Sequence, residues 1–234
     1  MIPVQAQEAQ YSEVRAGQRG FCLIDKPQGC SSFKVVQWVR RQSGEKKVGH
    51  AGTLDPFATG LLIVAIGREF TRQLSEFEGM DKVYEAEFVF GRSTDTLDPD
   101  GKQMFNDPDF RLNEVALHAA MQKWTGELLQ VPPAFSAIHV QGQRAYDLAR
   151  RGAVVTLGPR SVTIHSITST GPVTVTDGFP TVAVRVCCGK GTYIRALARD
   201  LALELGTQGY CHKLRRTAIG EYKVEQAMVP CLNE

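Results

Sequence analysis

The sequence has no marked excess of charge and no segment suited to a membrane. Its 234 residues include 27 lysines and arginines against 25 aspartates and glutamates, for a net charge of +2. A nucleic-acid-binding surface must therefore come from locally clustered basic residues, because the overall charge supplies little attraction for phosphate. No apolar run approaches the roughly 20 residues that cross a membrane. Residues 1–19 are polar and lack the hydrophobic segment of a secretory signal, so we expect a flexible extension there and a cytoplasmic protein.

Metal-binding patterns of cysteine are also missing. No two of the six cysteines form a Cys-x-x-Cys pair, and no histidine stands at the spacing of a zinc ligand. Nothing indicates export, which favours reduced thiols over disulfides. The six residues are Cys22, Cys30, Cys187, Cys188, Cys211 and Cys231. We expect no metal site and no membrane partner.

One stretch combines glycines, a proline and a lone carboxylate. Residues 49–62 are Gly-His-Ala-Gly-Thr-Leu-Asp-Pro-Phe-Ala-Thr-Gly-Leu-Leu, and the apolar run 61–66 predicts a buried strand or a passage from helix to strand. Glycines permit positive φ and close backbone approach, so this turn can hold Asp55 at the mouth of a pocket. Pro56 disfavours the α conformation at Asp55. An Asx turn with a solvated aspartate is the simpler interpretation of an isolated Leu-Asp-Pro.

The whole stretch resembles the catalytic loop of the TruB family of tRNA pseudouridine synthases, whose pattern is Gly-His-x-Gly-x-Leu-Asp-Pro-x-Ala-Thr-Gly. Further segments match the same family in the same order along residues 20–228. They include Asp-Lys-Pro-Gln-Gly-Cys-Ser-Ser at 25–32, Lys-Val-Tyr at 82–84, Lys-Gly-Thr-Tyr-Ile-Arg at 190–195 and Leu-Arg-Arg at 214–216.

The resemblance implies a role for six residues. Asp55 is implied as the catalytic nucleophile, and Arg195 as the residue that pairs with it. Arginine suits this task because its planar guanidinium stays protonated and can hold a carboxylate through two hydrogen bonds. The other substrate-binding residues implied by the resemblance are His50, Tyr84, Tyr193 and Leu214.

Two of these residues have equally simple structural interpretations. His50 could be a histidine with only a structural role, which is the commoner case for a lone histidine. Tyr84 could be a core residue, because it shares the apolar face of an alternating segment, residues 81–91, with Ala86, Phe88 and Phe90. Only the resemblance favours a substrate-binding role for either residue over these structural interpretations.

Two other kinds of site fail on spacing. Residues 96–107 place Asp98 and Asp100 at calcium-ligand offsets, but Thr96 stands at the first ligand position and Asp107 at the last. The run Gly-Lys-Gly-Thr at 189–192 lies between a predicted strand and a predicted helix, as a phosphate-binding loop would. It lacks the Gly-x-x-x-x-Gly-Lys-Ser/Thr spacing, which argues against a nucleotide hydrolase.

The patterns and the resemblance together predict an α+β fold. The resemblance implies the pseudouridine synthase fold, a mixed and largely antiparallel sheet flanked by helices with the active-site cleft across it. We expect residues 20–234 to form one catalytic domain, without the C-terminal PUA domain of many bacterial relatives. Predicted elements are strands at 20–25, 81–91, 161–169, 173–176 and 181–187, and helices at 33–41, 113–124, 144–151 and 193–205. The apolar side of helix 113–124 is predicted to comprise Val115, Ala116, Ala119, Ala120 and Trp124.

The resemblance implies an isomerase that converts uridine 55 in the TΨC loop of tRNA to pseudouridine, with no cofactor. Its partner would be the T stem-loop of tRNA, and we expect it to act as a monomer. Asp55 could attack C6 or C1′ of the nucleotide, or act as a base at C2′, and the sequence favours none of the three. Two alternatives stay open: an RNA-binding tRNA chaperone with the same fold, and a synthase that acts at a different RNA position.

Overall fold

The computed structural model describes residues 14–136, 138–140 and 142–232. The chain divides into two compact units. The first joins the residues up to Tyr84 to those from Arg215 onward, and the second is the continuous segment Glu85–Leu214. Two strands, β4 (Lys82–Phe90) and β13 (Gly209–Ile219), contain the points where the chain passes from one unit to the other.

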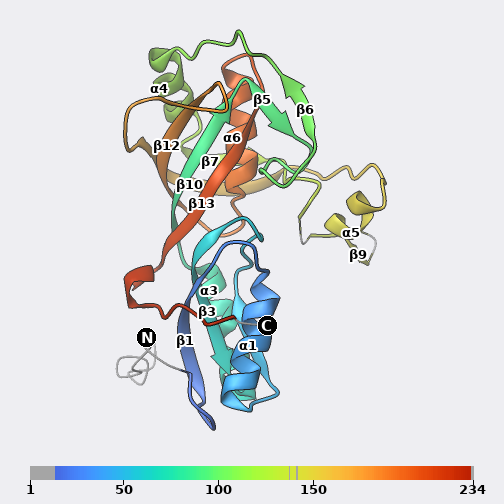
Figure 1. The fold of residues 1–234 in the computed structure, drawn as a ribbon, viewed down its shortest axis with the longest axis vertical. Coiled ribbons are helices and arrows are strands. Elements are labelled where there is room, and N and C mark those ends of the chain that lie inside the picture. Colours follow the sequence, from blue (N-terminus) through green and yellow to red (C-terminus); the bar gives the residue numbers. More distant parts are fainter. Residues whose placement is uncertain (1–13, 137, 141, 233–234) are drawn as a thin grey trace. The chain divides into compact units, whose positions relative to one another are not determined.

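The first unit is built on two long neighbouring strands (Figure 1). β1 (Gly20–Lys26) and β3 (Thr59–Ile66) pair antiparallel along their full length, from Gly20 opposite Ile66 to Lys26 opposite Gly60. β2 (Val48–Ala51) is also antiparallel to β3, whereas the first-unit part of β13 is parallel to it. β14 (Tyr222–Lys223) pairs with the end of β13 and leads into the short 3₁₀ helix η2 (Val224–Gln226).

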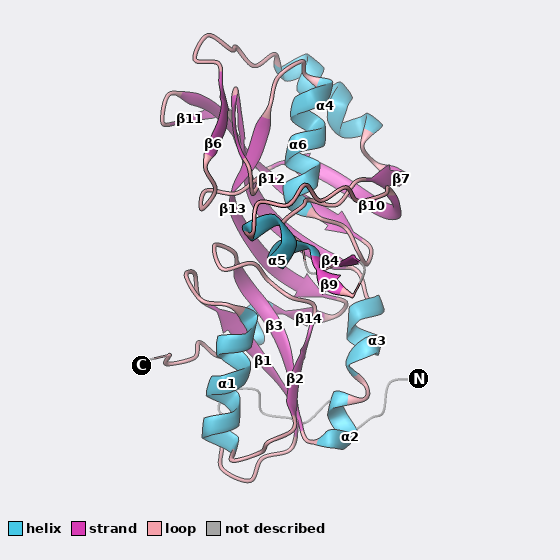
Figure 2. Ribbon diagram, turned by 90° about the vertical axis from the view of Figure 1, so that its right-hand side faces the viewer, coloured by secondary structure: helices cyan, strands magenta, loops and turns pink. Residues whose placement is uncertain are grey.

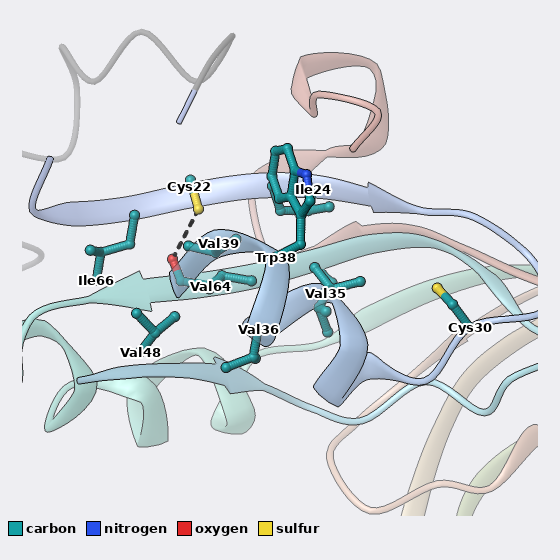
Figure 3. Close-up of a cluster of buried hydrophobic side chains, with 11 residues drawn as sticks. Cys22, Ile24, Cys30, Val35, Val36, Trp38, Val39, Val48, Val64 and Ile66 are labelled. Carbon is teal, nitrogen blue, oxygen red and sulfur yellow. Dashed lines mark hydrogen bonds between the residues drawn. The ribbon is translucent and has the colours of Figure 1, made fainter. Parts of the chain in front are cut away.

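Strand alternation sends the apolar side chains of β1 and β3 to both faces of this sheet. One face packs against α1 (Ser32–Ser43), as Figures 2 and 3 show. The other packs against α3 (Leu74–Gly79), which follows the short helix α2 (Arg68–Thr71). The side chains on the α1 side are Cys22, Ile24, Leu62, Val64 and Ile66 from the strands and Val35, Val36, Trp38 and Val39 from the helix. Full burial of each large apolar side chain contributes about 1.5–3 kcal/mol, so α1 is firmly held on the sheet.

The second unit has an antiparallel sheet with the order β4, β12 (Phe179–Cys188), β10 (Arg160–Ser169) and β7 (Gly126–Gln130). β11 (Thr174–Thr176) forms a hairpin with β12. Helices α4 (Glu114–Lys123) and α6 (Ile194–Glu204) contact each other (Figure 2). Two small hairpins complete the unit: β5 (Arg92–Thr94) with β6 (Gln103–Asn106), and β8 (His139–Val140) with β9 (Gln143–Arg144), which leads into α5 (Ala145–Arg150).

The α+β class and the largely antiparallel character of the sheet are confirmed, and the predicted strands and helices all occur with shifts of a few residues at their ends. The predicted buried face of α4 is wrong except at Ala120. The helix buries Leu117, Ala120 and Met121, while Val115 is 80% exposed. The apolar residues of this helix fit two adjacent faces, and Leu117 and Met121 have the larger side chains to bury. No helix among the described residues is long and apolar enough to cross a membrane.

The predicted N-terminal extension lies mostly outside the described residues, because residues 1–13 are not among them. The single catalytic domain predicted for residues 20–234 contains both compact units.

Candidate active site

Asp55 lies in the loop between β2 and β3 of the first unit, and its side chain is half-buried. The loop turns sharply after it, with the backbone N–H of Ala58 donating to the Asp55 carbonyl at 3.1 Å. Leu54 and Phe57 are buried on either side, at 3% and 4% exposure. The predicted turn that presents Asp55 before a buried strand is therefore present. We call residues 52–61 the Asp55 loop.

The backbone carbonyl of Pro56, the residue after Asp55, accepts a hydrogen bond from a buried lysine. Lys26, at the end of β1, is fully buried, and its Nζ donates to the carbonyls of Pro27 at 3.0 Å, Cys30 at 2.8 Å and Pro56 at 3.4 Å. The backbone N–H of Gly29 also donates to the Pro56 carbonyl, at 2.9 Å. Burial lowers the pKa of Lys26, and the negative charge of Asp55 opposes that effect. Lys26 thus supports the structure of the loop.

The residue that precedes Asp55 is held by a serine. Ser32 is the first residue of α1 and is 2% exposed. Its Oγ lies 2.9 Å from the backbone nitrogen of Leu54 and 3.1 Å from the Leu54 carbonyl oxygen. The N-cap of α1 is its neighbour Ser31, whose side chain accepts from the Lys34 N–H.

The two ends of the Asp55 loop are joined by Arg216, which is 1% exposed. Its Nε donates to the Leu61 carbonyl at 2.8 Å, and its Nη2 donates to the Gly52 carbonyl at 2.9 Å. The strand pairing places Arg216 directly opposite Gly60, where φ is +105°. A Cβ at position 60 would lie 2.3 Å from the Arg216 carbonyl oxygen, so only glycine fits this approach.

Sequence reasoning did not find this role of Arg216. The signal was the pair Arg215-Arg216, because neighbouring residues of a strand point to opposite faces and one of the two must then point inward. Arg215 takes the other face, where its Nη1 and Nη2 donate to the two carboxylate oxygens of Asp25 at 3.0 and 2.7 Å.

His50 lies on β2, at the entrance to the Asp55 loop, and is partly buried. Burial lowers its pKa, and the charge of Arg216 lowers it further. Both effects favour the neutral imidazole at neutral pH. Its Nδ1 is buried and has no hydrogen-bond partner within the described part of the chain. His50 therefore shares the first unit with Asp55, but its predicted contact with RNA stays a prediction.

Tyr84 and Leu214 stand at the two points where the chain leaves one unit for the other. Tyr84, on β4, is 9% exposed and is the last residue of the first segment of the first unit. Leu214, on β13, is 8% exposed and is the last residue of the second unit. Both side chains are thus largely withdrawn from solvent, and their predicted contacts with the target base stay predictions.

Arg195 and Tyr193 both stand at the start of α6 in the second unit. Tyr193 is the residue before the helix, and its N–H donates to Oε1 of Gln130 at 2.8 Å. Arg195 is 4% exposed; its Nη1 donates to the Thr96 carbonyl at 2.6 Å and its Nη2 to the Phe135 carbonyl at 2.8 Å. Nη1 also lies 3.4 Å from Oδ2 of Asp98. These contacts fix the guanidinium within its own unit.

The predicted pair of Asp55 with Arg195 joins residues of different units. Inside the second unit, the carboxylate that Arg195 contacts is that of Asp98, a contact that sequence reasoning did not foresee. The pairing with Asp55 stays a prediction.

The segment that resembled a calcium loop uses Asp98 for its own structure. Oδ1 of Asp98 accepts from the Thr96 hydroxyl at 2.6 Å and from the Asp100 N–H at 3.1 Å, while Oδ2 faces Arg195. Both carboxylate oxygens therefore have protein partners. Among the described residues, no group of three or more histidine, cysteine or acidic side chains is placed to hold a metal ion.

Comparison with known proteins gives one consistent family. Residues 40–194 match the model of the TruB family pseudouridylate synthase (N terminal domain). The chain is 49% identical to tRNA pseudouridine synthase B of Thermobifida fusca, over 89% of this chain and 72% of that protein. It is 43% identical to the protein of the same name from Desulfotalea psychrophila, over 89% of this chain and 85% of that protein.

Solved structures give the same fold. A chain of the Cbf5-Nop10-Gar1 complex matches with a TM-score of 0.65 and 26% identity, over 90% of this chain and 52% of that one. A chain of the archaeal box H/ACA sRNP Nop10-Cbf5 complex matches with a TM-score of 0.62 and 26% identity, over 91% of this chain and 51% of that one. The present chain thus spans about half the length of each of these solved chains.

Proposed function

Because the chain belongs to the TruB family of pseudouridylate synthases, we propose that it converts a uridine of tRNA to pseudouridine, with Asp55 as the catalytic residue. The observation that carries the proposal is the Asp55 loop itself. A half-buried carboxylate stands on a turn whose backbone is fixed by Lys26 and Arg216. Two relatives with 49% and 43% identity are named for the activity on tRNA.

The reaction breaks the N1–C1′ bond, turns the uracil and joins C5 to C1′. The proton of C5 is released and N1 gains one, so the product is an isomer and no electrons are transferred to a second reactant. Asp55 would act as a nucleophile at C6 or C1′, or as a base at C2′. The other groups would bind the flipped nucleotide: Tyr84 and Tyr193 through their rings and Leu214 through apolar contact. Arg195 would pair with Asp55, and His50 would contact the RNA.

The substrate position we propose is uridine 55 of the TΨC loop, in the cytoplasm. A uridine in a folded loop must leave its stack before a side chain can reach it, and the unpairing costs a few kcal/mol. A pocket lined by aromatic side chains can offset that cost, because their rings stack on any base.

A tritium-release assay tests the activity and the position together. The substrate is a tRNA transcript that carries tritium at C5 of its uridines, and a second transcript carries cytidine at position 55. We expect the wild-type protein to release tritium from the first transcript and almost none from the second. Equal release from both transcripts would reject the position, and no release from either would reject the activity on tRNA.

A further inference from the structure

Ser32 contacts the Asp55 loop at the residue directly before the carboxylate. Its Oγ is within hydrogen-bond distance of both backbone polar groups of Leu54, at 2.9 Å from the nitrogen and 3.1 Å from the oxygen. A hydroxyl has one proton and two lone pairs, so it can accept from the N–H and donate to the carbonyl at the same time. One side chain thus satisfies both groups of a residue that is 3% exposed.

The helix that carries Ser32 does not need this hydroxyl as a cap. The cap of α1 is Ser31, which is exposed and accepts from the Lys34 N–H at 3.1 Å. The two neighbouring serines therefore have different partners. Ser31 serves its own helix, whereas Ser32 serves a loop that lies 22 residues further along the chain.

The position of Ser32 is itself well fixed. α1 packs through Val35, Val36 and Val39 against the strands of the first unit (Figure 3). Because α1 is packed in place, the hydrogen bonds of Ser32 restrict the backbone conformation of the Asp55 loop at Leu54. Lys26 holds the Pro56 carbonyl on the other side of Asp55, so the backbone is anchored both before and after the carboxylate.

From this geometry we propose that Ser32 is a positioning residue: its hydroxyl sets the backbone conformation from which the Asp55 carboxylate is presented. The proposal rests on the function proposed above, since it assigns a role in the reaction of Asp55. Without the hydroxyl, the buried N–H and carbonyl of Leu54 must find other partners, and the loop moves to reach them. A displacement of about 1 Å at a reacting group can reduce the rate by roughly 100-fold.

Hydrogen exchange tests the structural half of the proposal without any need for activity. In Ser32→Ala we expect the backbone amide of Leu54, followed by NMR, to exchange at least tenfold faster than in the wild type. Ser31→Ala is the matched control, because it removes the same hydroxyl from the neighbouring position. It should speed exchange in the first turn of α1 and leave Leu54 unchanged. Unchanged exchange at Leu54 in Ser32→Ala would overturn the proposal.

Kinetics on tRNA test the functional half. We expect Ser32→Ala to lower kcat by 10- to 100-fold with KM within about twofold of the wild type, because the carboxylate is displaced while the RNA-binding surface is intact. Ser31→Ala should keep kcat within about twofold even where its melting temperature falls. Ser32→Cys keeps a weak donor and acceptor of similar size, so its kcat should lie between those of Ser32→Ala and the wild type.

Three results would count against the role. Full kcat in Ser32→Ala would overturn it, and so would an equal loss in Ser31→Ala, which would show a general effect of weakening α1. If Ser32→Ala does not fold, a wild-type kcat in Ser32→Cys combined with faster exchange at Leu54 would overturn it as well. Inactivity of the wild-type protein would instead reject the proposed function, and the exchange experiment would still decide whether Ser32 holds the loop.

Discussion

Each of the two units contains a loop that carries an aspartate and is contacted by a buried arginine, but the loops are held in different ways. In the second unit, the loop between β5 and β6 is closed largely by its own side chains. Thr94 Oγ1 donates to the Asp98 carbonyl at 2.6 Å, and Asp95 Oδ1 accepts from the Lys102 N–H at 2.8 Å. The carboxylate of Asp98 joins this network and faces Arg195. We call residues 94–102 the Asp98 loop.

The Asp55 loop is held by side chains that are remote in the sequence. Ser32, Lys26 and Arg216 all bind its backbone, and Arg216 reaches it across 155 and 164 residues. In the Asp98 loop the carboxylate of the aspartate itself makes hydrogen bonds that hold the loop. In the Asp55 loop the backbone is held by side chains from distant parts of the sequence. The contrast teaches that the backbone of the Asp55 loop is held from outside the loop, whereas the Asp98 loop is held largely by its own side chains.

The largest expected difference is between the two aspartates. Asp55→Asn should abolish tritium release from tRNA and lower the free energy of unfolding by less than Asp98→Asn does, because Asp55 is only half-buried whereas Asp98 is 7% exposed. Asp98→Asn should mainly lower stability, because it removes the negative charge that faces the buried guanidinium of Arg195, at a cost of about 3 kcal/mol. Urea unfolding and the tritium assay measure the two effects. Turnover of Asp55→Asn at the wild-type rate would reject Asp55 as the catalyst.

A second comparison uses the adjacent arginines of β13. Arg216→Lys leaves the Gly52 or the Leu61 carbonyl without its donor, so we expect a loss of about 2–3 kcal/mol together with reduced activity. Arg215→Lys keeps the charge opposite Asp25 at a site where the arginine side chain is 38% exposed, so we expect a loss below about 1 kcal/mol. Urea denaturation of both variants gives the difference. Equal losses would show that Arg216 is not a special anchor of the Asp55 loop.

A third comparison uses two glycines with nearly the same backbone conformation. Gly60 has φ +105° and Gly126 has φ +111°, but a Cβ meets the Arg216 carbonyl only at Gly60 and has open space at Gly126. Gly126→Ala should cost only the roughly 1–2 kcal/mol of the left-handed backbone. Gly60→Ala should cost more, because β3 must also move away from β13. The midpoints of chemical unfolding of the two variants test this, and an equal cost would contradict the close approach.

The smallest effect concerns pH and His50. The pKa of His50 in the folded protein lies below its ordinary value of 6.5, through burial and the charge of Arg216. The unfolded chain therefore binds more protons between these two values, so stability rises with pH across this window and is fully present above it. In His50→Gln the part of the stability loss at acid pH that comes from protonation of His50 should disappear. Melting temperatures at pH 7.5 and 5.5 test it, with His118→Gln at an exposed position of α4 as the control. An identical pH response in wild type and His50→Gln would contradict it.

The sequence predicted what depends on local pattern. The alternation in residues 81–91 and the apolar run 61–66 correspond to β4 and β3, and the predicted helix 33–41 corresponds to α1. The motif around Asp55 was enough to locate the candidate catalytic loop. The side chains that hold that loop were not predictable in the same way, because a buried serine or arginine shows no pattern of its own. Their partners are backbone groups that only the tertiary fold brings within reach.

β13 illustrates the same limit for secondary structure. Residues 214–216 of this strand match a family motif, but no strand is predicted here, because Lys213, Arg215 and Arg216 interrupt the apolar pattern. The strand buries Arg216 through specific carbonyl partners, and such compensation is invisible to a hydrophobicity pattern. In α4 the error was of another kind, because two adjacent faces of one helix were both apolar enough to be chosen.

The composition of the first unit has a consequence for the order in which the protein is made. Its two segments are separated by the whole of residues 85–214, and the Asp55 loop needs Arg216 from the later one. A ribosome synthesises the chain from its N-terminus. The second unit, residues 85–214, can therefore fold before the part of β13 that belongs to the first unit has been made. The Asp55 loop therefore reaches its final form only after residue 216 has been synthesised, so the candidate site forms later than the continuous second unit can.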